Sequence, residues 1–162
     1  SENVRGSIQE YAENSKSEIE KGNNFLQWVL TRVFEATEDD AADAIVDGAN
    51  DLGIDAYLPV DFSDNTIRLF QSKYGTSHSF EAIAKFKEDA KRLLGKDVSK
   101  MRPELAQLVT KIKEKNLKIK CCYVTDQKVE YQDELIEIID IEKIIQKLWE
   151  RIKNLLLEKD HQ

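Results

Sequence analysis

The sequence predicts an α/β domain in which a mixed central sheet is flanked by helices on both faces. Two observations predict this class: segments with apolar residues at helical spacing alternate with short extended segments, and their order is helices, hairpin, helices, strand, strand, helix. The chain has 162 residues, of which 41% are hydrophobic, and its two prolines mark no linker. We therefore expect one domain spanning residues 1–162. Because the chain opens on Ser1 without a methionine, the N-terminal part of a longer protein is an alternative to a complete one.

The first half of the chain predicts two helices and a hairpin. Apolar residues recur at helical spacing at Phe25, Trp28, Val29, Val33 and Phe34. Thr37 is a suitable N-cap for a second helix, whose apolar positions are Ala41, Ala42, Ile45 and Val46. Residues 54–61 and 66–74 have strand character, and the turn residues Ser63, Asp64 and Asn65 lie between them. Two antiparallel strands follow from this pattern.

The second half predicts helices on the sheet, two further strands and a terminal helix. Ser79 is a suitable cap for a helix that ends near Gly95, and Pro103 is suited to open the next one. Residues 117–124 and 135–139 are expected to form strands, and the residues from Ile141 to Leu155 an amphipathic helix. Trp28 and Trp149 stand at helical core spacing, so we expect both to be buried.

The sequence favours a soluble, cytoplasmic protein. No apolar run approaches the roughly 18 residues that span a bilayer, and the N-terminus is polar and acidic, unlike a secretory signal. We therefore expect no membrane partner. Cys121 and Cys122 are adjacent, which is a poor geometry for a disulfide and gives no CxxC metal spacing. Both are expected to be buried thiols.

The net charge of −7 is distributed unevenly along the chain. Residues 1–67 hold 4 basic and 15 acidic side chains, residues 68–128 hold 15 and 7, a net of +8, and residues 129–162 hold 5 and 9. A basic segment beside an acidic one suits a metal-dependent nuclease, which holds phosphates while its carboxylates bind a cation. The alternative is that these lysines and arginines only keep two surface helices solvated.

The predicted hairpin gathers polar residues on one face. If it turns about Asp64 without a bulge, Asp55 lies across from Lys73, and Tyr57 lies across from Gln71. Asp55 would then offer a carboxylate and Gln71 a carbonyl oxygen to Mg²⁺, with Lys73 near the scissile phosphate. Because a neutral amide leaves the cation under-compensated, a second carboxylate is expected. Asp47 and Asp39 are available, and we favour Asp51 and Glu35.

The two segments around this site resemble a known family. Residues 47–56, DGANDLGIDA, followed by residues 69–74, LFQSKY, resemble the D-x-G-I-D … Q-x-K core of Mrr-like restriction endonucleases of the PD-(D/E)XK superfamily. Within that superfamily, residues 25–74 most resemble the N-terminal domain of abortive phage infection proteins of the AIPR type. The rest of the chain matches only in its α/β order. Gln71 departs from the superfamily's commoner acidic residue, a departure that the Mrr-like branch shares.

This resemblance implies a restriction-endonuclease-like fold and a metal-dependent DNA endonuclease that defends against phage or foreign DNA. Its cofactor would be Mg²⁺ or Mn²⁺, and Asp55 with the Gln71 and Lys73 pair would be catalytic. With the two favoured carboxylates added, the predicted catalytic residues are Asp55, Gln71, Lys73, Asp51 and Glu35, and the predicted metal ligands are Asp55, Gln71 and Asp51. The alternative in the same class of fold is a catalytically silent module that binds nucleic acid or a protein partner. The simplest alternative is that Asp55 and Lys73 form an ordinary cross-strand pair on a solvated hairpin and have no catalytic role.

Basic residues after the hairpin are candidates for DNA binding. We expect Lys85, Lys91 and Arg92 to contact phosphates, with the solvated helix as the alternative. The terminal helix from Ile141 has apolar residues to spare, so a homodimer is also compatible with the sequence.

Overall fold

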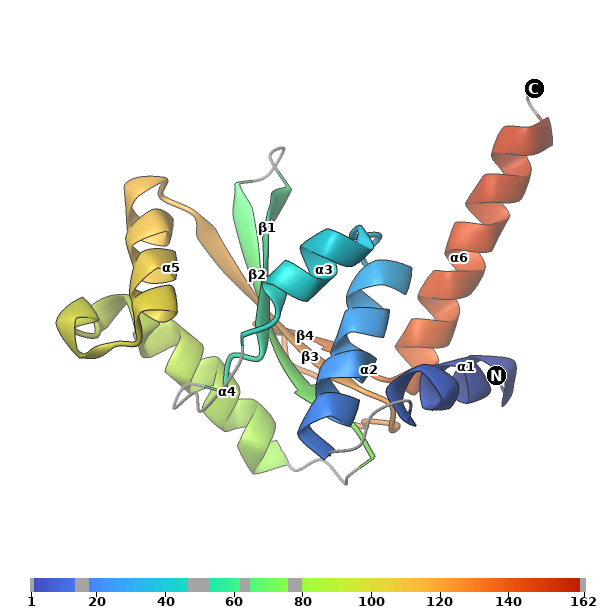
Figure 1. The fold of residues 1–162 in the computed structure, drawn as a ribbon, viewed down its shortest axis with the longest axis horizontal. Helices are drawn as coiled ribbons and strands as arrows, with labels where there is room; N and C mark the ends of the chain where they lie inside the picture. The colour runs from blue at the N-terminus through green and yellow to red at the C-terminus, as the bar shows by residue number, and fades with distance from the viewer. Residues whose placement is uncertain (1, 14–17, 47–52, 62–64, 76–79, 161–162) are drawn as a thin grey trace.

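A mixed four-stranded sheet forms the centre of the molecule in the computed structural model, which describes residues 2–13, 18–46, 53–61, 65–75 and 80–160. The strand order is β1 (Ala56–Asp61), β2 (Thr66–Lys73), β3 (Lys118–Thr125), β4 (Ile136–Ile139). β1 pairs antiparallel with β2, whereas β2, β3 and β4 are parallel to one another. Helices flank this sheet, and the predicted α/β class with a mixed sheet is confirmed (Figure 1).

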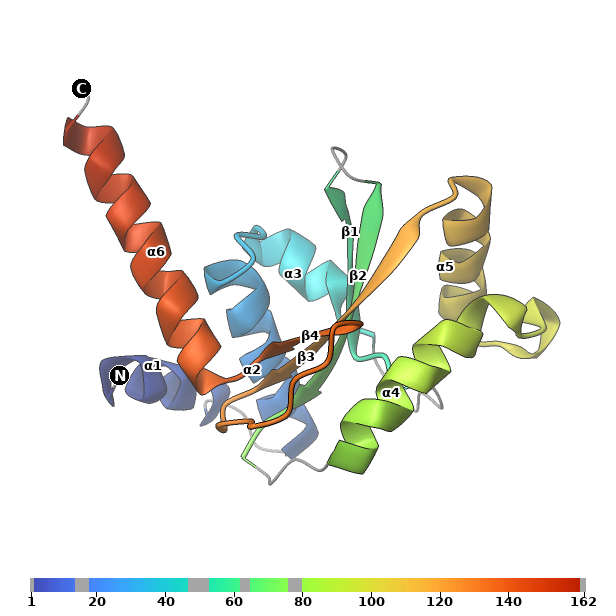
Figure 2. The same cartoon turned by 180° about the vertical axis from the view of Figure 1, so that it is seen from behind.

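Two groups of helices cover the two faces of the sheet. One face packs against α1 (Glu2–Glu13), α2 (Glu18–Arg32), α3 (Glu38–Ala44) and the start of α6 (Ile141–Asp160). The other packs against α4 (Phe80–Arg92) and α5 (Pro103–Glu114), which two short 3₁₀ helices, η1 (Leu93–Gly95) and η2 (Val98–Lys100), connect. Figure 2 shows α4 and α5 on the opposite side of the sheet from α2 and α6. The chain therefore builds two apolar clusters, one on each face.

Neighbouring residues of β3 belong to different clusters, as strand alternation requires. Cys121 lies in the cluster with α4 and α5, and Cys122 lies in the cluster with α1 and α2. Both thiols are free and buried, as predicted. Burial raises the pKa of Cys121 to about 11 and that of Cys122 to about 12, so both stay protonated at neutral pH.

The segment before the hairpin departs in part from its prediction. The Thr37 hydroxyl accepts from the Asp40 amide at 3.1 Å and caps α3, as expected. The helix ends at Ala44, however, and the predicted helical residue Ile45 is extended and bridges to Ala56. The chain therefore reaches the edge of β1 before it turns into the site. Ser79, Ser63 and Asp64, predicted as cap and turn residues, lie outside the described residues.

The hairpin register differs from the predicted one. Ala56 pairs with Phe70 and Leu58 with Arg68, while Asp61 pairs with Thr66, so β1 holds one extra residue between Leu58 and Asp61. Pro59 lies within this irregular stretch, and it has no backbone N–H to donate to a partner strand. Asp55 consequently stands across from Gln71 and not from Lys73. Because the total shift is two residues, the predicted common face of these side chains is preserved.

Helix α6 leaves the body of the molecule along its length (Figures 1 and 2). Its first turns are buried at Ile141 and Ile144, but Trp149 is 63% exposed, whereas Trp28 is 3% exposed. The predicted burial of Trp149 is therefore wrong, because no described element covers this part of the helix. None of the helices in the described ranges has the length and apolar character of a membrane span.

Candidate active site

Asp55 is fixed by main-chain hydrogen bonds on both sides. Its amide donates to the Phe70 carbonyl oxygen at 2.7 Å, and its carbonyl oxygen accepts from the Val46 amide at 2.9 Å. These bonds extend the sheet one residue beyond β1, so Asp55 sits on a rigid scaffold between β2 and the extended segment after α3. Its side chain lies on the same face as Tyr57, toward α4 and α5.

The Asp55 carboxylate is only partly exposed to water. Its Oδ2 accepts from the Ser72 amide at 2.8 Å. Burial raises the pKa of Asp55 above its usual value, while the Ser72 hydrogen bond and the positive charge of Lys73 oppose that shift. Without a bound cation, the fold therefore disfavours the ionised form of this carboxyl, and an added positive charge would relieve the penalty.

Gln71 stands beside Asp55 with its amide packed on Gly53. Gly53 has φ +65°, and a Cβ atom there would come within 2.6 Å of the Gln71 Nε2. Both the left-handed backbone and this close approach require glycine. The Gln71 Oε1 is buried and has no hydrogen-bond partner among the described residues. Such an orphaned acceptor costs about 1–3 kcal/mol, which makes it a candidate ligand atom.

Tyr123 on β3 adds a third polar group, which the sequence did not single out. It pairs with Gln71 in the parallel register, and its side chain is 0% exposed. Its hydroxyl is buried without a hydrogen-bond partner among the described residues. Burial and the nearby charge of Asp55 raise the pKa of Tyr123 to about 12. The only sequence signal for it is a hydroxyl-bearing aromatic residue inside the otherwise apolar stretch from Cys121 to Val124.

Lys73 completes the predicted trio at the carboxyl end of β2. It is exposed, shares the face of Gln71 by strand alternation, and its charge acts on the Asp55 carboxyl. The structure therefore brings Asp55, Gln71 and Lys73 together, with the register corrected. The exposed ammonium group of Lys73 can therefore bind a phosphate at the edge of this partly buried carboxylate site.

The predicted second carboxylate is not among the groups described around Asp55. Glu35 has φ 60°, and its carboxylate pairs with the Arg151 guanidinium of α6 at 3.2 Å, so it serves a different part of the molecule. Asp51 lies outside the described residues, as does Asp47. Within the described ranges, no three His, Cys, Asp or Glu side chains form a metal-binding group. The donor set described at this point is one carboxylate and one amide oxygen.

The predicted DNA-binding residues lie on α4, next to the site. Phe86 of this helix lies close to Gly53: a Cβ atom added to Gly53 would be 4.0 Å from the Phe86 Cδ1. Lys85, Lys91 and Arg92 are exposed on α4, and Lys91 pairs with Glu88 at 3.7 Å. Lys87, in contrast, is held by Asp133 at 2.5 Å. Helix α4 thus carries three exposed basic residues, with the exposed Glu88 among them, and it approaches the site at Phe86.

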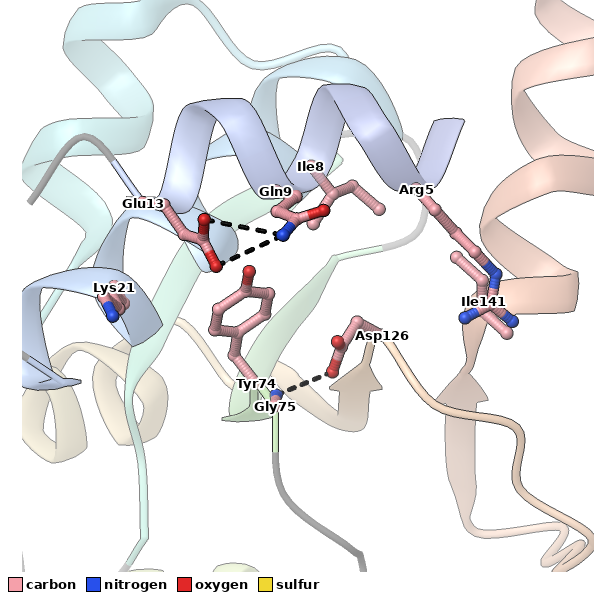
Figure 3. A pocket seen from close by; sticks show the side chains of 9 residues that line it. All are labelled: Arg5, Ile8, Gln9, Glu13, Lys21, Tyr74, Gly75, Asp126 and Ile141. Atoms are coloured by element: carbon pink, nitrogen blue, oxygen red, sulfur yellow. Dashed lines mark hydrogen bonds between the residues drawn. The ribbon is translucent and has the colours of Figure 1, made fainter. Parts of the chain in front are cut away.

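A separate cavity of about 390 Å³ opens at the carboxyl ends of β2 and β3 (Figure 3). The Gly75 amide donates to the Asp126 Oδ1 at 2.9 Å and ties the two strand ends together. Tyr74 stacks on Phe25 with ring centroids 5.3 Å apart. The lining carries both signs of charge and comes from Arg5, Ile8, Gln9, Glu13, Lys21, Tyr74, Gly75, Asp126 and Ile141. Its lining therefore favours neither anions nor cations.

Comparison of the chain with family models, with curated proteins and with solved structures finds no match. We therefore infer the chemistry of the site from its side chains alone. Carboxylate and amide oxygens are hard ligands of the kind that Mg²⁺ and Mn²⁺ take in proteins. A cationic side chain beside such oxygens is suited to hold a phosphate group.

Proposed function

We propose that this chain is a metal-dependent endonuclease that hydrolyses phosphodiester bonds of DNA with Mg²⁺ or Mn²⁺. One observation carries the proposal: the Asp55 carboxylate shares one face with the Gln71 Oε1, which no described residue bonds, and the exposed Lys73 acts electrostatically on Asp55. A relationship to the Mrr-like branch of the PD-(D/E)XK nucleases is part of this proposal and rests on the motif. We expect the activity in the cytoplasm, directed against phage or foreign DNA.

The residues present fit a divalent cation. Gln71 holds an acceptor that no described residue uses, and Asp55 holds a carboxyl whose ionisation a cation would favour. When bound, Mg²⁺ would activate water and offset the negative charge of the phosphate. Asp55 and Gln71 would hold it, while Lys73 would bind a phosphate oxygen and stabilise the charge that develops there. Lys85, Lys91 and Arg92 would contact the backbone of the DNA further along.

A catalytically silent module that binds nucleic acid or a protein partner is the second candidate. It is favoured by the donor set described around Asp55, which holds a single carboxylate. The two candidates differ in what Asp55 does. In an enzyme, this residue binds the cation, whereas in a silent module it is only a partly buried acid that weakens the fold.

The first test compares the native chain with Asp55→Asn by urea unfolding. The pKa of Asp55 is higher in the folded state than its unfolded value near 3.8. The free energy of unfolding therefore falls as pH rises from the unfolded to the folded pKa, and this loss of stability persists at pH 7. In EDTA at pH 7, Asp55→Asn should therefore be more stable than the native chain. This gap should close at pH 3, where both states of the native chain are protonated.

Adding Mg²⁺ or Mn²⁺ at pH 7 should reverse this order. A cation at 100 times its dissociation constant stabilises the folded state by about 2.7 kcal/mol, and Asp55→Asn should gain much less. Asp43→Asn, which changes an exposed acid of α3, is the matched control and should respond to metal as the native chain does. Equal responses of native and Asp55→Asn proteins, with DNA retardation unchanged by EDTA, would favour the silent module.

A further inference from the structure

The Tyr123 hydroxyl occupies a place at the site that packing does not explain. Tyr123 is 0% exposed among apolar residues of the cluster under α4 and α5, where a phenylalanine would fill the same volume. Its hydroxyl is buried and unpartnered among the described residues. Buried polar groups in folded proteins are nearly always hydrogen-bonded, so an orphaned hydroxyl points to a ligand or a water that satisfies it.

The neighbours of this hydroxyl are complementary to it. Gln71 lies directly across from Tyr123 in the β2–β3 register, and its orphaned Oε1 only accepts hydrogen bonds. When ionised, the Asp55 carboxylate also only accepts, and its charge then acts on Tyr123. The hydroxyl is a donor as well as an acceptor. No hydrogen bond joins it to either neighbour in the structure, so the donor and the two acceptors are left to a group that can bond all three.

We propose that Tyr123 is a positioning residue of the cleavage site, whose hydroxyl donates a hydrogen bond to a water held between Asp55, Gln71 and Tyr123. That water donates to the two acceptors and so satisfies all three side chains. The inference rests on the proposed function, because the same water would belong to the hydration of a cation held by Asp55 and Gln71. Tyr123 therefore contributes to cation affinity through the water.

The test is Tyr123→Phe, which removes only the hydroxyl. We expect the affinity for Mn²⁺, measured by calorimetry without DNA, to fall about tenfold, at the lower end of the effect of groups that orient metal ligands. The free energy of unfolding in EDTA should be equal to or higher than that of the native chain, since without the cation no described residue bonds this hydroxyl. Tyr57→Phe, on the same face of β1, is the control and should keep the native Mn²⁺ affinity.

Each outcome bears on the inference. Weaker Mn²⁺ binding at undiminished stability in EDTA supports it. Native affinity in Tyr123→Phe overturns it and leaves the proposed function standing. A loss of stability in EDTA that accompanies the loss of affinity also overturns it, since the hydroxyl would then support the fold. Absence of Mn²⁺ binding by the native chain overturns this inference together with the proposed function.

Discussion

Gly53 is the residue that allows Gln71 to stand beside Asp55. Gly53→Ala would place a non-glycine residue at φ +65° and a Cβ atom 2.6 Å from the Gln71 Nε2. We expect a loss of about 1–3 kcal/mol in the free energy of unfolding, because the left-handed conformation is strained for alanine. The Gln71 amide must also move, so the Mn²⁺ affinity should fall as well. Urea unfolding and calorimetry measure the two effects.

Gly22→Ala is the matched control for this substitution. Gly22 lies inside α2, has a negative φ, and a Cβ atom there would meet nothing within 4 Å. Alanine should raise the free energy of unfolding by about 0.5–1 kcal/mol, because glycine is a poor helix former. If Gly53→Ala were as stable as Gly22→Ala and bound Mn²⁺ with native affinity, the packing of Gln71 on Gly53 would matter neither for stability nor for metal binding.

The sequence predicted Asp55, Gln71 and Lys73 as neighbours because strand alternation depends only on parity. The bulge near Pro59 accounts for one residue of the two-residue change in pairing, which altered the partner of Asp55 but not its face. Tyr123 could not be found in this way. It follows Gln71 by 52 residues, and its place beside Gln71 depends on the parallel register of β2 and β3.

At the scale of elements, Asp133 ties the segment before β4 to helix α4. Its Oδ2 accepts from the Lys87 Nζ and from the Tyr131 hydroxyl, and its Oδ1 accepts from the Leu135 amide at 2.8 Å. The hydrogen bond from Lys87 is the main cause that lowers the pKa of Asp133 to about 2. This carboxylate therefore helps to hold α4, the helix that borders the site, against the sheet.

Asp133→Asn should lower stability at pH 7 and flatten its acid dependence. A carboxyl with a depressed folded pKa contributes stability that is fully present above its unfolded value near 3.8 and is lost as pH falls through about 2. Urea unfolding between pH 2 and 7 would show a steeper acid loss for the native chain than for Asp133→Asn. Glu134→Gln changes an exposed neighbour and should follow the native curve; an identical result for Asp133→Asn would contradict this role.

Most helices and strands were predictable, and the exceptions have physical reasons. The core helices α2, α4 and α5 have wide apolar faces, so their periodicity is clear. Helix α1 was missed because few of its residues are apolar and it contains Gly6, which disfavours a helix. In α6, the sequence could not distinguish the buried Ile144 from the exposed Trp149, because both follow the same spacing.

At the scale of the whole molecule, charge and apolar surface fall on different parts. The segment with a net charge of +8, residues 68–128, contains most of β2 and all of α4, α5 and β3, so it includes both Lys73 and the helix beside the site. The apolar surface lies instead on α6, where Trp149, Ile152, Leu155, Leu156 and Leu157 are 48–63% exposed. Patches of this kind often mark interaction sites. The homodimer compatible with the sequence stays a prediction.

The most direct test of the nuclease proposal is cleavage of supercoiled plasmid with Mg²⁺ or Mn²⁺ by the native chain, Asp55→Asn and Lys73→Ala. Lys153→Ala, which changes an exposed residue of α6, is the control. We predict cleavage by the native chain and by Lys153→Ala, none in EDTA, and a loss of at least about 10²-fold in the two site variants. Full cleavage by Asp55→Asn, or no cleavage by the native chain with either metal while it still retards DNA, would contradict the proposal.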